Sequence, residues 1–394
     1  MEKHGVRRIG VLTGGGDCPG LNAVIRGVVK TGIYRYGLEV VGIEDGYLGL
    51  IENRMHVMDP TEVSNILTSG GTILGACNKA DPARYAIWKD GQWTHRDVTD
   101  EVIEHYRRWK LDALVVIGGD GTMAGANHLI RHGLKVVGVP KTIDNDLPET
   151  DITFGHDTAA ATAADALDKV HTTASSHHRV MVVELMGRYA GWLALRAGVA
   201  SGADVILIPE IPFRIDAVAA RCVERSKHGK RFTIIAAGEG AYPAGGEMIV
   251  DHMDKSSPDP LRLGGVAKCV ASEIERATGL ESRSIVLGHI QRGGTPTAFD
   301  RVLGTMLAHH AVELVMAGRF GELVVFRGGK IDSVPIDAIA GRIKTVPADD
   351  PLVQAARSVG TCFGDDRTVG PRARAATISA DPRQDSHSEP RRPD

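Results

Sequence analysis

The sequence predicts an α/β protein with two lobes, each built on a doubly wound, Rossmann-like parallel sheet. Short runs rich in β-branched residues recur along the chain, and segments with helical spacing of apolar residues separate them. This alternation of strand and helix is typical of parallel sheets that carry helices on both faces. With 394 residues, 43% of them apolar, the chain is also longer than one compact domain usually needs.

The expected strands are short and apolar, as in a sheet that is buried on both faces. They span residues 8–12, 39–43, 113–117, 135–139, 180–184, 205–209, 232–237 and 284–287. The connecting segments that show helical spacing are residues 20–36, 121–131, 157–174 and 297–317. The expected order is therefore β-α-β-α throughout, with every strand parallel and buried.

Domain boundaries follow from this order. We expect a first lobe over residues 1–154, with a return segment at about 291–340, and a second lobe over residues 155–290. How the last helices are exchanged between the lobes stays open. Residues 367–394 are rich in Arg, Asp, Pro and Ser and nearly lack large apolar side chains, which predicts a disordered tail.

Composition narrows the class of partner. The formal net charge of -3 gives no reason to expect a nucleic-acid or membrane surface, so a small polar substrate fits better. The five cysteines are far apart and show no CxxC pair, which argues against disulfides and a structural zinc site. No apolar run is long enough for a signal peptide or a membrane span, so we expect a cytoplasmic protein.

Glycine-rich loops follow two of the predicted strands. Residues 13–20 read TGGGDCPG, and residues 118–122 read GGDGT. Glycines that open a helix let backbone N–H groups approach an anion at the positive end of that helix. Asp120 adds a carboxylate suited to Mg²⁺. A single loop of this kind is as easily a turn without a ligand, but two on neighbouring strands indicate a phosphate site.

A third loop, residues 140–146, reads PKTIDND directly after a buried strand. It could be an Asx-rich turn in which Asp144 and Asn145 cap the backbone. However, a hydroxyl that attacks a phosphoryl group needs a carboxylate to accept its proton and groups that hold the phosphate. Asp144 fits the base, Thr142 can donate to the phosphoryl group, and Asp146 is a second candidate beside Asp120 for Mg²⁺.

Cationic residues accompany the strands of the second lobe. We expect five of them to gather at one sheet edge and to bind a doubly charged phosphate ester: Arg179, Arg188, Arg283, His289 and Arg292. Glu239, between two glycines after another strand, would contact sugar hydroxyls.

Several motifs are missing. There is no GxxxxGK[ST], no HExxH and no spaced Cys/His set, so a P-loop kinase and a zinc hydrolase are excluded. The tripeptide at 95–97 reads HRD but lacks the Asn that a protein-kinase loop needs five positions later. The sequence also lacks the GxGxxG motif and the ribose-binding acid that an NAD-dependent oxidoreductase would carry. A non-catalytic regulatory paralogue remains as an alternative.

Taken together, these segments resemble the ATP-dependent 6-phosphofructokinase family, in its mixed-substrate, actinobacterial-like branch, from residue 8 to about residue 339. The matching segments are TGGGDCPGLNAVIR, EDGYLGL, GGTILG, IGGDGT, PKTIDND, VVELMGRYAGW, GEG and VLGHIQRGGTPTAFDR. The resemblance implies the phosphofructokinase fold and a first lobe that binds nucleotide and Mg²⁺. It also implies ATP-dependent phosphorylation of fructose 6-phosphate, a step of glycolysis, and a homotetramer or homodimer whose subunits share active sites.

The resemblance also implies residue roles. Asp144 is the general base, acting with Thr142 and Arg188. ATP is bound by Gly16, Tyr47, Asn78, Lys79, Gly119, Asp120, Gly121 and Thr122, and Asp120 holds Mg²⁺. The sugar phosphate contacts Thr142, Asp144, Asp146, Arg179, Met186, Gly187, Arg188, Glu239, Arg283, His289 and Arg292. Of these, Arg179 and Arg283 reach the site from a neighbouring subunit.

Departures from the family pattern leave two questions open. Asn78 stands where regulated bacterial members have an arginine that bridges the substrates, so that contact is missing unless Lys79 replaces it. Pro60 and His171 stand where those members have effector-binding arginines, which puts effector control in doubt. Lys141 is typical of pyrophosphate-using relatives, so a pyrophosphate-dependent enzyme is the alternative. Gly121 favours ATP, because the pyrophosphate enzymes carry Asp at this position.

Overall fold

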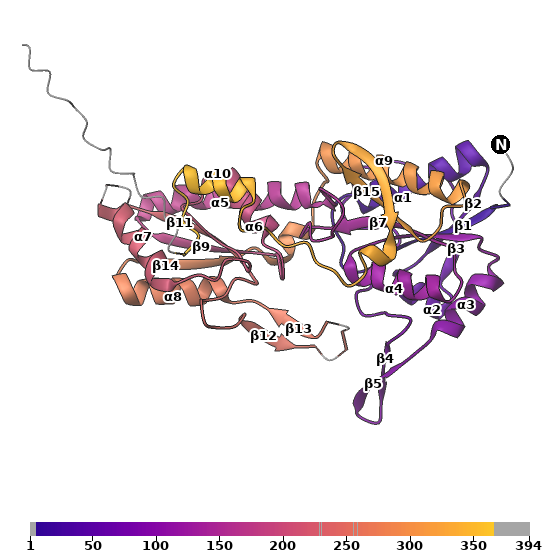
Figure 1. Ribbon diagram of the computed structural model, residues 1–394, viewed down its shortest axis with the longest axis horizontal. Coiled ribbons are helices and arrows are strands. Elements are labelled where there is room, and N and C mark those ends of the chain that lie inside the picture. Colours follow the sequence, from indigo (N-terminus) through magenta and orange to yellow (C-terminus); the bar gives the residue numbers. More distant parts are fainter. Residues whose placement is uncertain (1–4, 228, 230, 255, 258, 366–394) are drawn as a thin grey trace, which may run out of the picture.

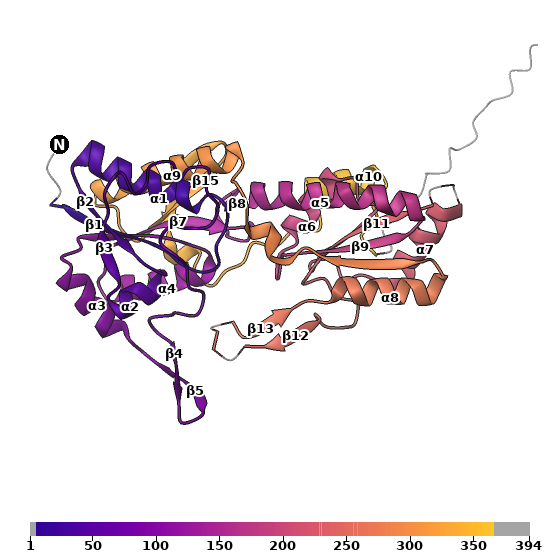
Figure 2. The same ribbon diagram turned by 180° about the vertical axis from the view of Figure 1, so that it is seen from behind.

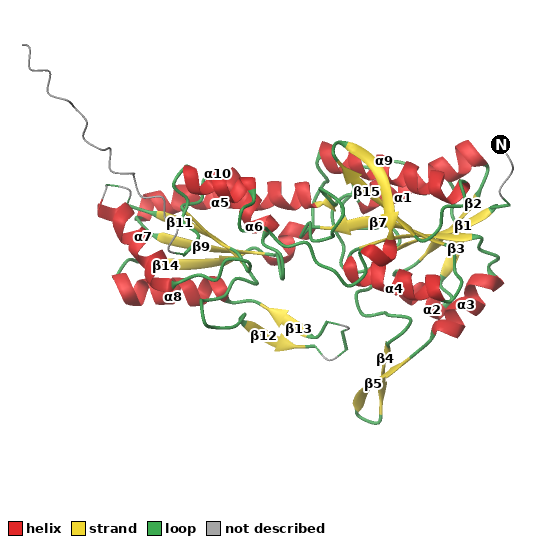
Figure 3. Ribbon diagram, in the orientation of Figure 1, coloured by secondary structure: helices red, strands yellow, loops and turns green. Residues whose placement is uncertain are grey.

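The structure is a computed structural model that describes residues 5–227, 229, 231–254, 256–257 and 259–365. It forms two lobes side by side, each with a central sheet between layers of helices (Figures 1 and 3). The expectation of an α/β fold with two doubly wound parallel sheets is confirmed. The predicted tail at 367–394 lies outside the described residues.

The first sheet positions the glycine-rich loops. Its strands lie in the order β16 (Lys330–Pro335), β15 (Glu322–Arg327), β7 (Val136–Thr142), β6 (Ala113–Gly118), β1 (Arg8–Thr13), β2 (Glu39–Ile43) and β3 (Met55–Val57), with β8 (Phe154–Gly155) beside β7. The pairs β7–β6, β6–β1 and β1–β2 are parallel. The loops after β1, β6 and β7 therefore leave from one edge of the sheet.

Alternate residues of these strands pack on opposite helix layers, as a sheet buried on both faces requires. One layer contains α1 (Leu21–Lys30), continued by the π-helical turn η1 (Thr31–Arg35), and α9 (Ala298–Met316). The other contains α2 (Tyr47–Glu52), α3 (Thr99–Arg108), α4 (Asp120–Arg131) and the 3₁₀ turn η3 (Ile336–Ala338). Val115 faces the first layer, and its neighbours Leu114 and Val116 face the second.

The second sheet has the order β10 (Val205–Leu207), β11 (Thr233–Gly238), β9 (Val180–Leu185) and β14 (Ser282–Val286), all parallel. One face packs on α5 (His156–His177), α6 (Trp192–Ala200) and α10 (Pro351–Ser358). The other packs on α7 (Ile215–Lys227) and α8 (Val266–Thr278), and the 3₁₀ turn η2 (Gly288–Arg292) follows β14. The second lobe therefore repeats the layered design of the first.

The chain crosses between the lobes more than once. After η2 it returns to the first lobe, where α9 packs on α1 and β15 joins β7. It then crosses back, so that α10 packs on the second sheet and Cys362 pairs with Val205 of β10. The first of these crossings lies where a return segment at about 291–340 was predicted. The domain boundaries at 154 and 290 stay a prediction.

Two expectations about the strands were wrong. The order is not β-α-β-α throughout, because antiparallel hairpins are inserted at β4 (Tyr85–Lys89) with β5 (Gln92–Arg96), at β12 (Val250–Met253) with β13 (Leu261–Leu263), and at β15 with β16. The strand expected at 284–287 is not buried: it belongs to β14, an edge strand with Val286 60% exposed.

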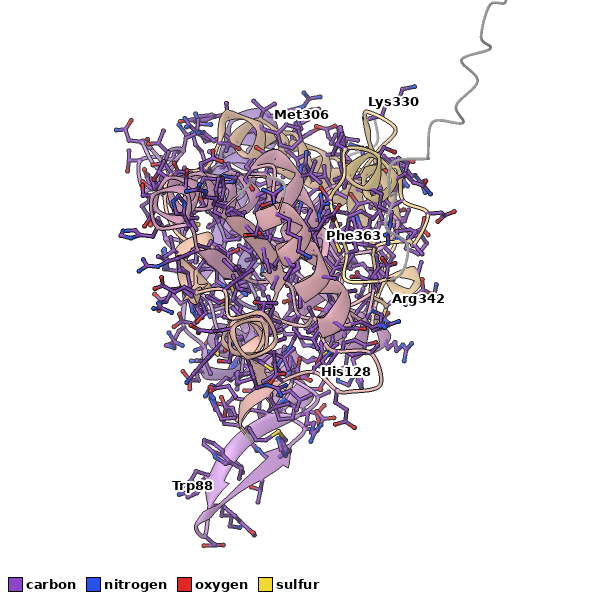
Figure 4. All side chains as sticks on the ribbon, turned by 90° about the vertical axis from the view of Figure 1, so that its left-hand side faces the viewer. Trp88, His128, Met306, Lys330, Arg342 and Phe363 are labelled. Carbon is purple, nitrogen blue, oxygen red and sulfur yellow. The ribbon has the colours of Figure 1, made fainter. Side chains whose placement is uncertain are left out.

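Two of the inserted hairpins, β4–β5 and β12–β13, leave the body of the molecule on the same side (Figures 1 and 2). The β4–β5 hairpin protrudes from the first lobe and carries Trp88 (Figure 4). The β12–β13 hairpin leaves the second lobe and extends towards the first. Within the described part of the chain, no helix combines the length and the apolar character that crossing a membrane would require.

Candidate active site

The loops after β1, β6 and β7 meet in a cleft of about 450 Å³. They meet because the three strands are parallel neighbours, so their carboxyl ends share one sheet edge. The cleft is lined by twelve of the predicted site residues: Gly16, Tyr47, Asn78, Gly119, Asp120, Gly121, Thr122, Thr142, Asp144, Asp146, Arg188 and Arg292. The first ten come from the first lobe or its loops, and Arg188 follows β9 of the second lobe.

The loop after β6 presents the start of a helix to the cleft. Helix α4 begins at Asp120, so the unpaired N–H groups of its first turn, with the positive end of the helix dipole, face an incoming phosphate. At Gly121, a Cβ atom built on the backbone meets no atom within 4 Å. The hydroxyl of the buried Tyr47 donates to the Thr122 carbonyl at 2.7 Å and holds this turn in place.

The loop after β7 carries two carboxyl groups with unused acceptors. Asp144 Oδ1 and Asp146 Oδ1 are buried and have no hydrogen-bond partner among the described residues. Burial raises the pKa of both carboxyl groups above the usual range, and the mutual repulsion of the two charges raises the pKa of Asp146 further. Arg292 opposes this shift for Asp144. A carboxylate with a raised pKa is suited to accept a proton near neutral pH.

Hydrogen bonds with residues that follow it in the sequence fix the backbone of this loop. Asn145 has a left-handed φ of 52°, and its side-chain oxygen accepts a hydrogen bond from the Thr153 N–H at 3.0 Å. The Thr153 hydroxyl donates to the Thr142 carbonyl at 2.7 Å, and His156 Nδ1 lies 2.6 Å from the Ile143 carbonyl. These contacts fix the direction in which Asp144 leaves the backbone. The capping role considered from sequence thus belongs to Asn145.

Cationic groups surround the two carboxylates. The buried ammonium of Lys141 donates to the Gly16 carbonyl at 2.6 Å, and burial lowers the pKa of Lys141. Arg292 Nη1 donates to the Asp17 carbonyl at 3.0 Å. Arg188 forms an ion pair with Asp259 of the segment that joins β12 to β13. The cleft therefore combines carboxylates with cations at positions suited to phosphate oxygens.

The remaining residues of the predicted sugar site lie next to the cleft. His289 and Arg292 line an adjoining hollow of about 520 Å³, which Gly16 and Asn78 also border. Met186, Gly187 and Glu239 follow β9 and β11, and the Glu239 N–H donates to the Leu185 carbonyl at 2.8 Å. Burial raises the pKa of Glu239 to about 7, with a further contribution from Glu184.

Arg179 and Arg283 correct the expectation that five cations gather at one sheet edge. Arg179 precedes β9 and Arg283 is near the start of β14, so both lie at the amino ends of their strands, whereas Arg188 and Arg292 follow the carboxyl ends. A strand of six residues spans ~20 Å. Arg179 and Arg283 instead pair with Glu281, at 2.8 and 2.6 Å. Within one chain the cluster is split.

Lys79 also departs from expectation. It is not among the described residues that line the cleft. Its ammonium donates to Ser256 Oγ at 2.7 Å and lies 3.1 Å from Asp254 Oδ2, so it ties the first lobe to the β12–β13 hairpin. The missing arginine at Asn78 is therefore not replaced by Lys79 in this arrangement.

Residues of the β12–β13 hairpin were missed by sequence reasoning. Ser257, Asp259 and Arg262 line the cleft from the second lobe. The segment between Glu239 and β14 shows no strand or helix periodicity until α8, and its only signal is its length together with the charges at 254, 259 and 262.

A divalent metal fits the cleft only as a partner of a phosphate ligand. Among the described residues, no group of three or more His, Cys, Asp or Glu side chains forms a preformed cage. Mg²⁺ is usually held by one or two carboxylates together with phosphate oxygens. Asp120 and Asp146 line the cleft, and the unpartnered Asp146 Oδ1 is available to such an ion.

Comparison with known proteins identifies the family. The family model described as Phosphofructokinase matches residues 8–315. The chain is 48% identical to "ATP-dependent 6-phosphofructokinase 2" of Clostridium perfringens over 365 residues, which cover 91% of this chain and 99% of that protein. It is 45% identical to "ATP-dependent 6-phosphofructokinase" of Spirochaeta thermophila over 369 residues, or 93% and 100% of the two chains.

Among solved structures, the chain matches Pichia pastoris phosphofructokinase in the T-state with a TM-score of 0.72 and 31% identity. The match covers 85% of this chain and 35% of that chain, so this chain spans about a third of the yeast protein. The family model, the near full-length bacterial relatives and the shared fold agree with the arrangement of the three loops: the chain belongs to the phosphofructokinase family.

Proposed function

We propose that this protein transfers the γ-phosphoryl group of ATP to the 1-hydroxyl of fructose 6-phosphate, giving fructose 1,6-bisphosphate and ADP, a step of glycolysis. One observation carries the proposal: Asp144 lies in the cleft formed by the phosphate-binding loops, and its buried Oδ1 has no hydrogen-bond partner among the described residues. Asp144 accepts the proton of the attacking hydroxyl, which makes that oxygen a better nucleophile. Thr142 and Arg188 donate to the phosphoryl group as charge develops on it.

The donor site is the first-lobe part of the cleft. The turn at Gly119–Thr122 binds phosphate oxygens through the N–H groups of α4, and Gly121 leaves space beside them. Relatives at 48% and 45% identity carry the name ATP-dependent, so ATP is favoured over pyrophosphate. Lys141 does not decide between the donors, because its ammonium is bonded to the Gly16 carbonyl and can serve either chain of phosphates.

The acceptor site is the second-lobe part of the cleft and the adjoining hollow. Arg188 and Arg292 bring positive charge there, and His289 adds an imidazole. Glu239, whose carboxylate interacts with both arginines, would contact the sugar hydroxyls. Met186 and Gly187 shape the wall beside Arg188. Mg²⁺, held by Asp120 with Asp146 as a second ligand, would neutralise charge on the phosphate oxygens of the donor.

The active site is completed by a second subunit in this proposal. Arg179 and Arg283 cannot reach their own cleft but are well placed to reach a neighbour's, because Arg283 is 50% exposed on the edge strand β14. Exposed apolar side chains lie close by in sequence on β14, η2 and α9: Val286, Ile290, Phe299, Val302 and Met306. Such a surface fits a homo-oligomer, which we propose to be a homotetramer or a homodimer. The cytoplasmic location stays a prediction.

A coupled assay of fructose 1,6-bisphosphate formation tests the function. The purified full-length protein is given fructose 6-phosphate and Mg²⁺ with either ATP or pyrophosphate. Product formation with ATP supports the proposal, and the absence of product with both donors would favour a non-catalytic paralogue. Efficient use of pyrophosphate with poor use of ATP would reverse the donor assignment and leave the base and the sugar site in place.

A further inference from the structure

The segment that carries the chain back to the second lobe lies against the loop after β7, which carries Asp144. We call residues 340–347, between η3 and α10, the strap; it follows the first-lobe return segment and passes between the lobes (Figure 1). The Lys344 N–H donates to the Asp146 carbonyl at 2.7 Å. The ammonium of Lys344 donates to the Thr150 carbonyl at 2.8 Å and to the Asp151 carbonyl at 3.3 Å. One residue therefore binds both ends of the segment from Asp146 to Asp151.

The same residue contacts the second lobe. Trp192 Nε1, in the first turn of α6, donates to the Lys344 carbonyl at 2.9 Å. The Lys344 ammonium also lies 5.5 Å from the centre of the Trp192 ring, within the range of a cation–π contact. Lys344 thus donates its N–H and ammonium to the segment that continues the Asp144 loop. Its carbonyl accepts a hydrogen bond from the helix that follows the Arg188 loop.

Glu210 makes a second link of the same kind. Its carboxylate accepts a hydrogen bond from the strap N–H of Val346 at 2.8 Å and from the N–H of Gly191 at 2.9 Å. Gly191 follows Arg188 by three residues, so this carboxylate joins the strap to the loop that carries the arginine. The strap end of this link is anchored in the protein interior, because Val346 is only 3% exposed and packs in the second-lobe core.

The side chains of Lys344 and Glu210 are partly buried, and this desolvation destabilises their charged forms. Burial lowers the pKa of Lys344 to about 8 and raises the pKa of Glu210. A neutral polar side chain could cap most of these backbone groups without that cost. Charge-assisted hydrogen bonds are stronger than neutral ones and hold their partners more tightly. Tight geometry is what the two loops need if they are to act on one phosphoryl group.

We propose that Lys344 and Glu210 are positioning residues that set the placement of the Asp144 loop relative to the Arg188 loop. The proposal rests on the proposed function, in which Asp144 accepts the proton and Arg188 stabilises the transferred phosphoryl group. Neither Lys344 nor Glu210 lines the cleft within the described part of the chain. Their effect therefore passes through the backbone of the two loops.

The test compares Lys344→Met with Arg342→Met in the full-length protein. Met keeps an apolar side chain against Trp192 but removes the ammonium. Arg342 is an exposed strap residue at the outer edge of the molecule (Figure 4) and serves as the matched control. We expect Lys344→Met to lower kcat by roughly 10- to 100-fold, as expected for reacting groups moved out of alignment. The KM for ATP should stay within about twofold, because among the described residues no backbone hydrogen bond joins the nucleotide turn at Gly119–Thr122 to the strap.

A purely structural role would lower thermal stability without this split between kcat and KM. Lys344→Arg, which keeps the cation over Trp192, should recover most of the lost kcat. If Lys344→Met does not fold, Trp192→Phe decides, since it keeps a ring and removes only the donor to the Lys344 carbonyl. A kcat for either variant equal to that of the wild type would overturn the proposal. An inactive wild type would instead overturn the proposed function.

Discussion

Arg188 and Asp259 form an ion pair that joins the loop after β9 to the β12–β13 hairpin, and both residues line the cleft. The Tyr189 hydroxyl donates to the same carboxylate at 3.4 Å. In the proposed reaction, Arg188 must instead face a phosphoryl group or the sugar phosphate. The carboxylate of Asp259 therefore competes with the substrate for this guanidinium.

Asp259→Asn should lower the KM for fructose 6-phosphate. The Asp259 side chain is 43% exposed, so the pair contributes only ~0.2–1 kcal/mol, which corresponds to a change of about 1.5- to 5-fold. Steady-state kinetics at saturating ATP measure it. Asp254→Asn is the matched control, because Asp254 belongs to the same hairpin but pairs with Lys79 and Arg262. An unchanged or higher KM in Asp259→Asn would contradict this competition.

Asp144→Asn should remove the general base and lower kcat by at least ~10²-fold. The amide is nearly isosteric with the carboxylate, so the contacts behind the loop through Asn145, Thr153 and His156 should remain. Binding of both substrates, measured by calorimetry, should change little. Asp349→Asn, at an exposed position before α10, is the control. Near-normal turnover in a folded Asp144→Asn protein would disprove the assignment.

The raised pKa of Asp144 predicts two effects of pH. As a base it must be ionised, so kcat should fall as the pH drops through a value above the ordinary Asp pKa of about 3.9. The folded protein binds this proton more tightly than the unfolded chain does. Ionisation of Asp144 therefore lowers the stability of the folded protein as the pH rises from about 3.9 through the folded pKa. Asp144→Asn should therefore melt at a higher temperature than the wild type at pH 7.5, and the gain should vanish towards pH 4. A lower melting temperature at pH 7.5 would count against the unpartnered carboxylate.

Mixed oligomers test the sharing of the site between subunits. Arg283→Ala removes a guanidinium that the proposal assigns to a neighbour's sugar site, and Asp144→Asn removes the base of the subunit's own site. Each variant should be nearly inactive alone. Mixed subunits should regain part of the activity, because some sites then combine an intact base with an intact arginine. Verified mixed oligomers without recovered activity would contradict a shared site.

Much of this architecture is readable from sequence because parallel strands leave a strong signal. Each of the eight expected strands has a counterpart in the structure, and the loops at Gly16, Asp120 and Asp144 meet because consecutive carboxyl ends share a sheet edge. The β4–β5 and β12–β13 hairpins were missed because their strands are short and contain no fully buried residue, so they need no apolar alternation.

Other parts depend on tertiary contacts that the residue types do not encode. Arg179 and Arg188 are both close to an end of β9, and only the direction of the strand separates them, a difference that the expectation of one cationic cluster overlooked. Lys79 was assigned to the nucleotide because it follows a cleft residue, yet Asp254 lies 175 positions further along the chain and pairs with it. The strap carries no motif, since many of its contacts are made by the backbone groups of Lys344 and Val346.

The donor preference should depend on Gly121. This residue is the second of α4, and a Cβ built there meets no atom within 4 Å, so the fold accommodates a side chain that would point into free space of the cleft. In Gly121→Asp the new carboxylate lies in the first turn of the helix, where a negative charge is favourable by ~0.3–1 kcal/mol. A loss of ATP use cannot then be attributed to unfolding, which a melting curve would verify.

The carboxylate of Gly121→Asp would meet the α-phosphate of ATP with both bulk and like charge, an arrangement that costs several kcal/mol. We therefore expect kcat/KM for ATP to fall by ~10²-fold or more. Pyrophosphate has no α-phosphate with a nucleoside attached, so its use should fall far less. Gly121→Asn, with the same size and no charge, separates the two effects and should lose less than Gly121→Asp. Equal losses with both donors would show that Gly121 does not select between them.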